Sequence, residues 1–356
     1  MQLRTAFGVV ELKVWRGKNP VDGHWGIPIR ERWGLLPHQQ LSPALEDKLA
    51  YFATVAGSYD LAARLAGKVG IVIEDSTVRS LVQRLGARAE AQTQARLRTV
   101  PVEKCPESPA SELAVVMVDG FQVRHRGPGW GRRKTAKPRV EWHEQKVGVC
   151  YRQEQNAGGQ LTEKVVVSWQ GDAVDLGERL HWEGLRQGLG RARQSVAVGD
   201  GAAWVWRLIG ARWQQAHQVL DFYHASEHLH ALAEALYPTE EGARHRWVDR
   251  QCHDLRHGRQ KKVLQVMARL RARHGATGAV IDRERNYFQT HRQRLNYQQV
   301  ARRGWPIGSG SVESACAQKQ GRFKRPGQFW TQQGLRHLNA LIEARDLSHW
   351  ENLWSN

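Results

Sequence analysis

The chain has 356 residues, 41% of them hydrophobic, which allows two or three domains with a proper core and excludes global disorder. Its 53 Lys and Arg residues outnumber the 35 Asp and Glu residues and leave a net charge of +18, which favours a polyanionic partner over a merely basic soluble protein. Because the four cysteines form no C-x-x-C pair, neither a disulfide framework nor a zinc knuckle is indicated.

Residues 1–40 are expected to form a small β and loop unit. Ala6–Trp15 alternates roughly between apolar and polar residues, as a strand does, whereas Gly17–Pro37 is rich in Gly, Pro and Trp and is typical of a loop. The first residues lack the long apolar segment of a secretion signal, and no run of 18 apolar residues occurs in the chain. We therefore expect neither secretion nor a membrane span.

The next segment, residues 41–100, has the pattern of a helix-turn-helix. Ser42 and Pro43 are typical of a helix start, a second short helix follows a Gly-Ser break, and a third helix is expected to be capped by Asp75 and Ser76. Arg79 and Arg84 on the third helix would then reach phosphates or base edges. An ordinary three-helix bundle with a solvated basic face is the alternative interpretation.

After a Pro-rich linker, the periodicity changes to that of an α/β sheet. The order of elements is three strands, then helix, strand, helix, strand and helix, which predicts a mixed sheet whose first three strands are linked by hairpins. The first strand, Leu113–Val118, is expected to end at Asp119, and Phe121–Val140 is expected to be an exposed basic loop. The remaining expected strands are Lys146–Tyr151, Lys164–Trp169, Val196–Val198 and Val219–Leu220.

Beyond residue 230 the sequence predicts a helical insertion and then a return to the sheet domain. Residues 231–303 contain no strand pattern and are strongly basic, so we expect an all-helical insertion domain. Residues 110–230 would be the first part of the interrupted domain and residues 304–356 its last part, with a Gly-Ser loop leading into a helix that carries Glu313. The coarse fold class is α/β.

Three carboxylates occupy positions where functional groups are often placed. Asp119 and Asp200 follow apolar strands, and Glu313 begins a helix behind a glycine-rich loop. Oxygen ligands of this kind suit Mg²⁺ or Mn²⁺, and two such ions can promote phosphoryl transfer. Each acid also has a plainer explanation, since Asp-Gly pairs are common in turns and a glutamate favours a helix N-terminus.

Four strings give the chain a resemblance to a known family. The longest are VLDFYHASEHLHALAEALYP and PIGSGSVESACAQKQGRFKRPGQFWTQQGLRHLNALIEAR, with VDGFQV and EWHEQKVGV upstream. They resemble the DDE transposases of bacterial insertion sequences, most closely the Kra-type group. The pair Asp221 and His224 resembles the Asp-x-x-His signature of the Mutator-like groups. The likeness extends from about residue 40 to the C-terminus and implies a ribonuclease-H-like catalytic domain preceded by a helical DNA-binding region.

The resemblance also implies roles for individual residues. Asp119, Asp200 and Glu313 would be the catalytic residues and bind two Mg²⁺ or Mn²⁺ ions, with Asp221 and His224 as a support pair. The group often carries a zinc-binding cysteine pair near the N-terminus, which this chain lacks, so no zinc is expected. Basic residues would contact DNA phosphates: Arg79, Arg84, Arg124, Arg126, Arg132, Arg133, Lys134, Arg302, Arg303, Arg322, Lys324 and Arg325.

Two smaller interpretations concern His and Trp residues. His224, Glu227 and His228 are a rival zinc site, because histidines four residues apart on a helix suit that metal. Trp130, Trp305 and Trp330 would either stack on unpaired bases or simply pack in the core.

The implied activity is hydrolysis at the ends of the insertion sequence followed by transfer of the freed 3′-OH into target DNA. The protein would act as a dimer or larger assembly on transposon ends and target, in the cytoplasm and on the nucleoid when bound. A ribonuclease-H-like nuclease without strand transfer and a domesticated, non-catalytic DNA-binding protein are the alternatives.

Overall fold

The computed structural model describes residues 1–21, 23–33, 35, 39–99, 113–131, 139–153, 161–270 and 275–354. The contacts divide the chain into two compact units. The first unit comprises Met1–Arg98, Val123–Trp142 and Lys319–Asn356, and the second comprises Thr99–Gln122 and His143–Gln318. Within the described residues, no helix combines the length and the apolar character that crossing a bilayer requires.

The first unit begins with two small hairpins. Strands β1 (Gln2–Thr5) and β2 (Gly8–Glu11) pair antiparallel, as do β3 (Gly17–Lys18) and β4 (Trp25–Gly26), before the short helix α1 (Pro28–Arg32). The strand expected over Ala6–Trp15 is therefore confirmed only for Gly8–Glu11. Ala6 and Phe7 form a turn, which the Thr5 hydroxyl closes by donating to the Gly8 carbonyl at 2.9 Å.

Three helices follow where the sequence predicts them: α2 (Pro43–Val55), α3 (Tyr59–Lys68) and α4 (Asp75–Leu97). The Ser42 hydroxyl accepts the Leu45 N–H and Pro43 occupies the first turn, which confirms the expected start of α2. The cap expected for α4 is wrong, because the N-cap residue is Glu74 and its side chain makes no capping bond.

The C-terminal helix α13 (Gln332–Asp346) packs along α4 and completes the core of the first unit. A glycine allows this approach, because a Cβ at Gly86 on α4 would lie 2.4 Å from the His337 carbonyl oxygen on α13. Leu81 and Leu85 on α4 and Leu338 and Leu341 on α13 are buried, as the helical spacing of these leucines requires.

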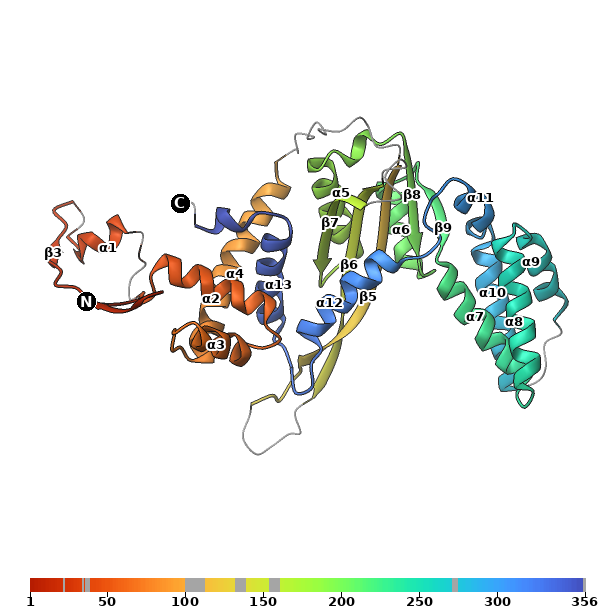
Figure 1. Ribbon diagram of the computed structural model, residues 1–356, viewed down its shortest axis with the longest axis horizontal. Helices are drawn as coiled ribbons and strands as arrows, with labels where there is room; N and C mark the ends of the chain where they lie inside the picture. The colour runs from red at the N-terminus through yellow and green to blue at the C-terminus, as the bar shows by residue number, and fades with distance from the viewer. Residues whose placement is uncertain are drawn as a thin grey trace. The chain divides into compact units, whose positions relative to one another are not determined.

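The second unit contains a five-stranded mixed sheet, seen in Figure 1, in the order β7-β6-β5-β8-β9. Strand β8 pairs parallel with both β5 and β9, and β6 pairs antiparallel with β7. The helices α5 and α6 pack on each other, α5 also on β7 and α6 on β8. The bounds are β5 (Leu113–Arg126), β6 (Val140–Gln153), β7 (Leu161–Trp169), α5 (Ala173–Arg186), β8 (Gln194–Gly199), α6 (Ala203–Arg212) and β9 (His217–Leu220).

Strand β5 is longer than its apolar run predicts. Leu113–Val118 is buried throughout, but the strand continues through Asp119 to Arg126, so Asp119 lies inside it and not at its end. The expected basic loop over Phe121–Val140 is therefore wrong at both ends, which are strand residues. From Phe121 onward buried and more exposed residues alternate, which is the period of a half-buried strand.

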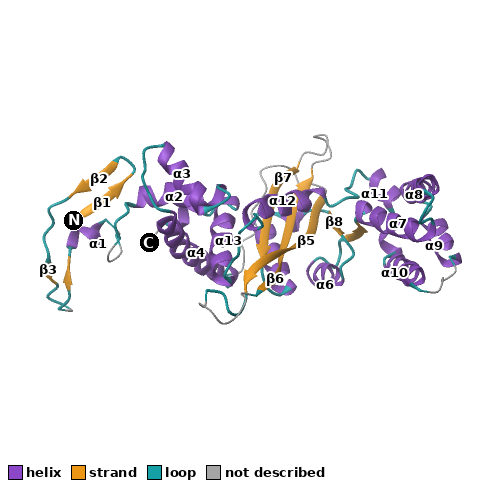
Figure 2. Cartoon of the chain, turned by 90° about the horizontal axis from the view of Figure 1, so that it is seen from below, coloured by secondary structure: helices purple, strands orange, loops and turns teal. Residues whose placement is uncertain are grey.

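The helices after β9 gather into one bundle, which Figure 2 shows with α7 to α11 side by side. Phe288, Tyr297 and Leu255 are among the side chains fully buried in this region. A loop at residues 303–309 then leads into α12, whose first turn carries Glu313. The bounds are α7 (Phe222–Leu236), α8 (Glu241–Arg256), α9 (Gln260–Arg269), α10 (Ala276–Thr290), α11 (Tyr297–Arg302) and α12 (Gly310–Phe323).

Candidate active site

Three aspartates lie in or directly after parallel strands of the second unit: Asp119 within β5, Asp200 after β8 and Asp221 after β9. Met117 on β5 is paired with Val198 on β8, so Asp119 and Asp200 each lie two residues beyond matched positions. Gly199 is paired with Leu220 on β9, which places Asp221 beside Asp200, and the Asp221 N–H donates to the Gly199 carbonyl at 2.8 Å. Adjacent strands are about 4.8 Å apart, so the register brings these carboxylates to one region of the sheet.

Asp119 and Asp200 influence each other electrostatically. Burial raises the pKa of the Asp119 carboxyl above its ordinary value, and the charge of Asp200 adds to this. Hydrogen bonds from the Gly120 N–H and the Cys316 thiol, together with the nearby His224, oppose the rise in pKa. The support role of His224 stays a prediction, and the Cys316 contact is one that sequence reasoning missed.

The Cys316 contact brings α12 to the aspartates. Glu313 lies one helical turn before Cys316, and side chains three residues apart share a helix face, about 5–6 Å apart at Cβ. Glu313 is exposed, and its Oε1 accepts a hydrogen bond from the Ser309 hydroxyl at 2.5 Å. The helix that carries the third predicted acid therefore reaches Asp119 through Cys316, while the Glu313 carboxylate itself is engaged by the Ser309 hydroxyl.

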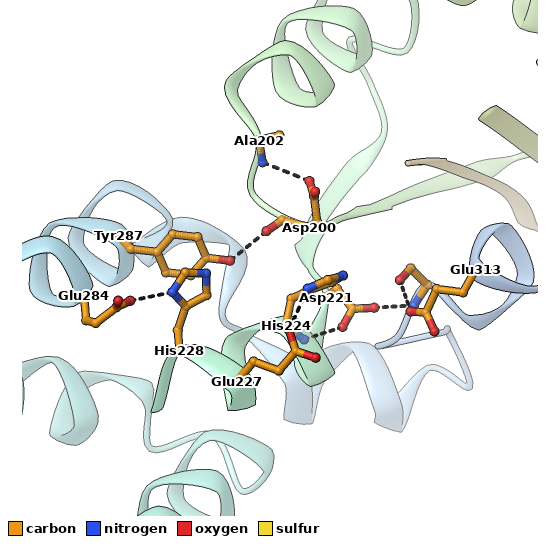
Figure 3. A network of polar contacts seen from close by, with 10 residues as sticks. Asp200, Ala202, Asp221, His224, Glu227, His228, Glu284, Tyr287 and Glu313 are labelled. Atoms are coloured by element: carbon orange, nitrogen blue, oxygen red, sulfur yellow. Dashed lines mark hydrogen bonds and ion pairs between the residues drawn. The ribbon is translucent and has the colours of Figure 1, made fainter. Parts of the chain in front are cut away.

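Asp221 joins two elements through backbone contacts. It is fully buried, its Oδ1 accepts the His224 N–H at 2.9 Å as the N-cap of α7, and its Oδ2 accepts the Ser309 N–H. Figure 3 shows this carboxylate between the first turn of α7 and the residues before Glu313. Asp221 therefore positions α12, and with it Glu313, without itself facing solvent.

A tyrosine from α10 holds the Asp200 loop. The Tyr287 hydroxyl donates to the Asp200 carbonyl at 2.7 Å, while the Asp200 carboxylate accepts the Ala202 N–H at 2.9 Å. Gly201 has a φ of +102°, and a Cβ there would lie 2.7 Å from the Tyr287 hydroxyl, so the loop needs glycine twice over. The sequence carries no local sign of this contact, since Tyr287 is 87 residues away.

The same tyrosine explains the histidine cluster. The His228 ring stacks on Tyr287 with centroids 3.6 Å apart, and its Nδ1 is hydrogen-bonded to the buried Glu284, as Figure 3 shows. His224 instead lies 3.2 Å from Glu227. The two histidines thus have separate acidic partners, and the geometry does not favour the rival zinc site formed by His224, Glu227 and His228.

For the DNA cleavage that the sequence predicts, we expect Tyr287→Phe to lower the rate more than it destabilises the fold. The ring stacking remains, and loss of one hydrogen bond to the Asp200 carbonyl costs about 1 kcal/mol. A supporting contact of this kind typically contributes 10–100-fold to activity, so we expect a rate loss of about 10-fold and a higher Mg²⁺ requirement. DNA cleavage rates over a Mg²⁺ series test this, with Tyr51→Phe as control, and equal rates for both variants would contradict it.

The donor chemistry suits a divalent cation, but the arrangement is incomplete. Asp119 and Asp200 offer oxygen ligands side by side, and their mutual repulsion is what a cation would relieve. Within the part of the chain that the structure describes, however, no three His, Cys, Asp or Glu side chains are grouped so as to hold one metal ion. The aspartate pair therefore fits a cation, and Glu313 faces Ser309.

The predicted DNA contacts fall into exposed and engaged groups. Arg132, Arg133 and Lys134 lie outside the described residues. Arg124 and Arg126 are on β5, where they donate to the carbonyls of Arg325 and Phe329. Exposed and available to a phosphate are Arg79, Arg302, Arg303, Lys324 and Arg325. Arg84 forms an ion pair with the buried Glu46, so its charge is partly neutralised within the helical core.

Arg322 is a correction to that set. It is only 6% exposed, its guanidinium donates to the carbonyls of Ala53 and Gly57 at 3.3 Å, and it lies over the rings of Tyr59 and Trp330. Burial lowers its pKa to about 10. A side chain so enclosed cannot reach a DNA backbone, and Arg322 therefore packs inside the first unit.

Trp330 is also packed, since it is buried and its indole N–H donates to the Phe323 carbonyl at 2.8 Å.

Arg322→Ala and Lys324→Ala should separate folding from DNA binding. We expect Arg322→Ala to lower the free energy of unfolding by about 2–4 kcal/mol, because it leaves buried carbonyls and rings without their partner. Lys324→Ala should leave stability unchanged within ~0.5 kcal/mol and reduce the salt dependence of duplex binding by about one phosphate contact. Urea unfolding and binding titrations at several salt concentrations measure both, and the reverse pattern would refute the assignment.

Comparisons with known proteins give little further. No family model matches the chain, and no curated protein matches it by sequence. Among solved structures, it is similar to the chain described as "Drosophila P element transposase strand transfer complex", with 12% identity and a TM-score of 0.38 over 85% of this chain and 92% of that one. A likeness of this strength supports no conclusion about function.

Proposed function

We propose that the protein is a DDE-type transposase of an insertion sequence, with a ribonuclease-H-like catalytic domain and DNA as its substrate. The observation that carries the proposal is the meeting of Asp119 and Asp200 from parallel strands with the helix that carries Glu313. The strand order β7-β6-β5-β8-β9, with β6 antiparallel to β7 and β8 parallel to both β5 and β9, supports the fold assignment. The net charge of +18 supports DNA as the partner.

In this proposal Asp119 and Asp200 hold divalent cations, with Glu313 as the third ligand and Asp221, His224 and Tyr287 as positioning residues. A bound Mg²⁺ or Mn²⁺ would supply Lewis-acid activation of the attacking oxygen and stabilise the leaving oxygen. Water first attacks a phosphodiester at the end of the insertion sequence and releases a 3′-OH. That 3′-OH then attacks a target phosphodiester, whose own 3′ oxygen leaves.

One reaction tests this function against its neighbours. The protein is incubated with Mg²⁺, a target plasmid and a labelled DNA duplex. This duplex contains the sequences that flank the protein's own gene on both sides. Joined products support the transposase, and cleavage without joining would replace it by a nuclease. Binding without either product would replace it by a non-catalytic DNA-binding protein. Omitting the metal and adding a chelator provides the control, and products formed with chelator would contradict the metal-dependent site.

A further inference from the structure

A cavity lies at the opposite ends of the strands from the aspartates. It has a volume of about 890 Å³ and is lined by the first residues of β5, β8 and β9, including Ala114, Ser195 and His217. Strand β8 has six residues, which corresponds to roughly 20 Å at 3.3 Å per residue. The cavity is therefore separate from the proposed catalytic site.

The cavity is lined by positive and not by negative side chains. None of its lining residues is Asp or Glu. Three arginines and two histidines contribute to its wall: Arg193, Arg212, Arg303, His181 and His217. Burial lowers the pKa of His181 and of His217, each with a further contribution from a neighbouring arginine. The histidines are therefore neutral hydrogen-bonding groups at neutral pH, and the guanidinium groups supply the charge.

Two aromatic groups complete the wall in a repeated arrangement. Trp213 lies edge-on to His181 with centroids 5.5 Å apart, and Trp305 lies edge-on to His217 at 5.8 Å. The Arg303 guanidinium is 4.8 Å from the Trp305 ring centre. Trp305 is 6% exposed, and its indole N–H has no hydrogen-bond acceptor among the described residues, although buried indoles ordinarily find one.

We infer that this cavity is a second nucleic-acid site, which binds the phosphates and bases of an unpaired DNA strand. Guanidinium groups bind phosphate in a bidentate manner, and a partly exposed ring beside a basic groove, as Trp213 is, stacks on bases without sequence preference. The volume is within the range of pockets that enclose a ligand. The inference rests on the proposed function in taking DNA as the partner, but it places this strand away from the acids that would cut DNA.

The test is binding of a fluorescein-labelled octathymidylate to the full chain, measured by anisotropy without divalent metal. We expect Arg193→Ala/Arg303→Ala to weaken binding at least about 10-fold. The slope of the logarithm of the binding constant against the logarithm of the salt concentration should fall in magnitude by about 1.4, which corresponds to two phosphate contacts with a single strand. The control is Arg207→Ala/Arg269→Ala, which removes the same charge from exposed helix positions outside the cavity. Thermal unfolding by circular dichroism establishes that both variants are folded.

Equal weakening in both double variants would overturn the inference, because binding would then follow surface charge alone. Displacement of the oligonucleotide by inorganic phosphate at equal nucleotide-equivalent concentration would also overturn it, since the bases would contribute nothing. The end-joining reaction is scored separately. If DNA ends are joined but the cavity variant binds the oligonucleotide normally, only this inference is refuted. If the cavity variant binds weakly but the native chain neither cleaves nor joins DNA, this inference stands and the proposed transposase function is refuted.

Discussion

Asp200→Asn should abolish DNA cleavage and joining and leave the fold intact. Asp200 is partly exposed beside Asp119, and its carboxylate makes a single local bond to the Ala202 N–H, which the asparagine oxygen can still accept. Loss of a supporting residue around a metal costs 10–100-fold, so loss of a proposed ligand should exceed ~100-fold. Single-turnover cleavage and joining rates with Mg²⁺ measure the effect.

The same variant should be as stable as the native chain or slightly more so without metal. A carboxyl whose pKa is raised on folding binds its proton more tightly in the folded state, so ionisation above that pKa opposes folding. Removing the neighbouring charge from Asp119 should therefore raise the Tm by about 1–3 °C in the presence of a chelator. Added Mg²⁺ should raise the Tm of the native chain and not that of the variant.

Asp249→Asn on the exposed face of α8 is the matched control, with no change expected in rate or in metal response. If Asp200→Asn retained joining while Asp249→Asn lost it, the assignment of the site would be wrong. Equal Mg²⁺ stabilisation of both variants would remove Asp200 from the set of metal ligands.

Asp221→Ala should have the opposite profile, with the largest loss of stability of any aspartate in the second unit. Its carboxylate is fully buried and accepts two backbone N–H groups, from His224 and Ser309. Removing it deletes a helix cap and leaves two buried donors unpaired, which together cost about 2–4 kcal/mol. Urea unfolding of the purified variants measures this free energy.

Asp221→Asn distinguishes the helix cap, which accepts the His224 N–H, from the hydrogen bond that accepts the Ser309 N–H. The amide oxygen can still accept the His224 N–H, but its NH₂ group faces the Ser309 N–H, so about 1–2 kcal/mol of the loss should remain. Activity should fall in both variants, because α12 and Glu313 lose their fixed position. Native stability in Asp221→Ala would show that Asp221 does not join these elements.

Much of the sheet could be predicted because its signals are local. Apolar runs of two to six residues, at Leu113–Val118, Val196–Val198 and Val219–Leu220, are the interiors of buried strands, and the helices between them have the 3.6-residue period. Parallel strands then bring the residues that follow them together, so the spacing predicts that Asp200 and Asp221 are neighbours. The end of β5 was missed because strand pairing continues where hydrophobicity stops.

The contacts that arrange the site were not predictable, because each joins residues far apart in the chain. Asp221 and Ser309 are 88 residues apart, and Tyr287 and Asp200 are 87 apart. In the sequence Arg322 cannot be distinguished from the exposed Lys324 two residues later. Arg322 is nevertheless buried, because its side chain packs against the rings of Tyr59 and Trp330. No local pattern distinguishes these two side chains.

The sequence by itself therefore determined the order of strands and helices, the positive charge and the residue types available for chemistry, since periodicity and composition are properties of neighbouring residues. Only the tertiary structure decided that Asp119 and Asp200 lie side by side, that Asp221 is a buried connector, and that Arg193 and Arg303 line one cavity. The physical reason is burial, because a charged group is catalytic, structural or ligand-binding according to what surrounds it after the chain has folded.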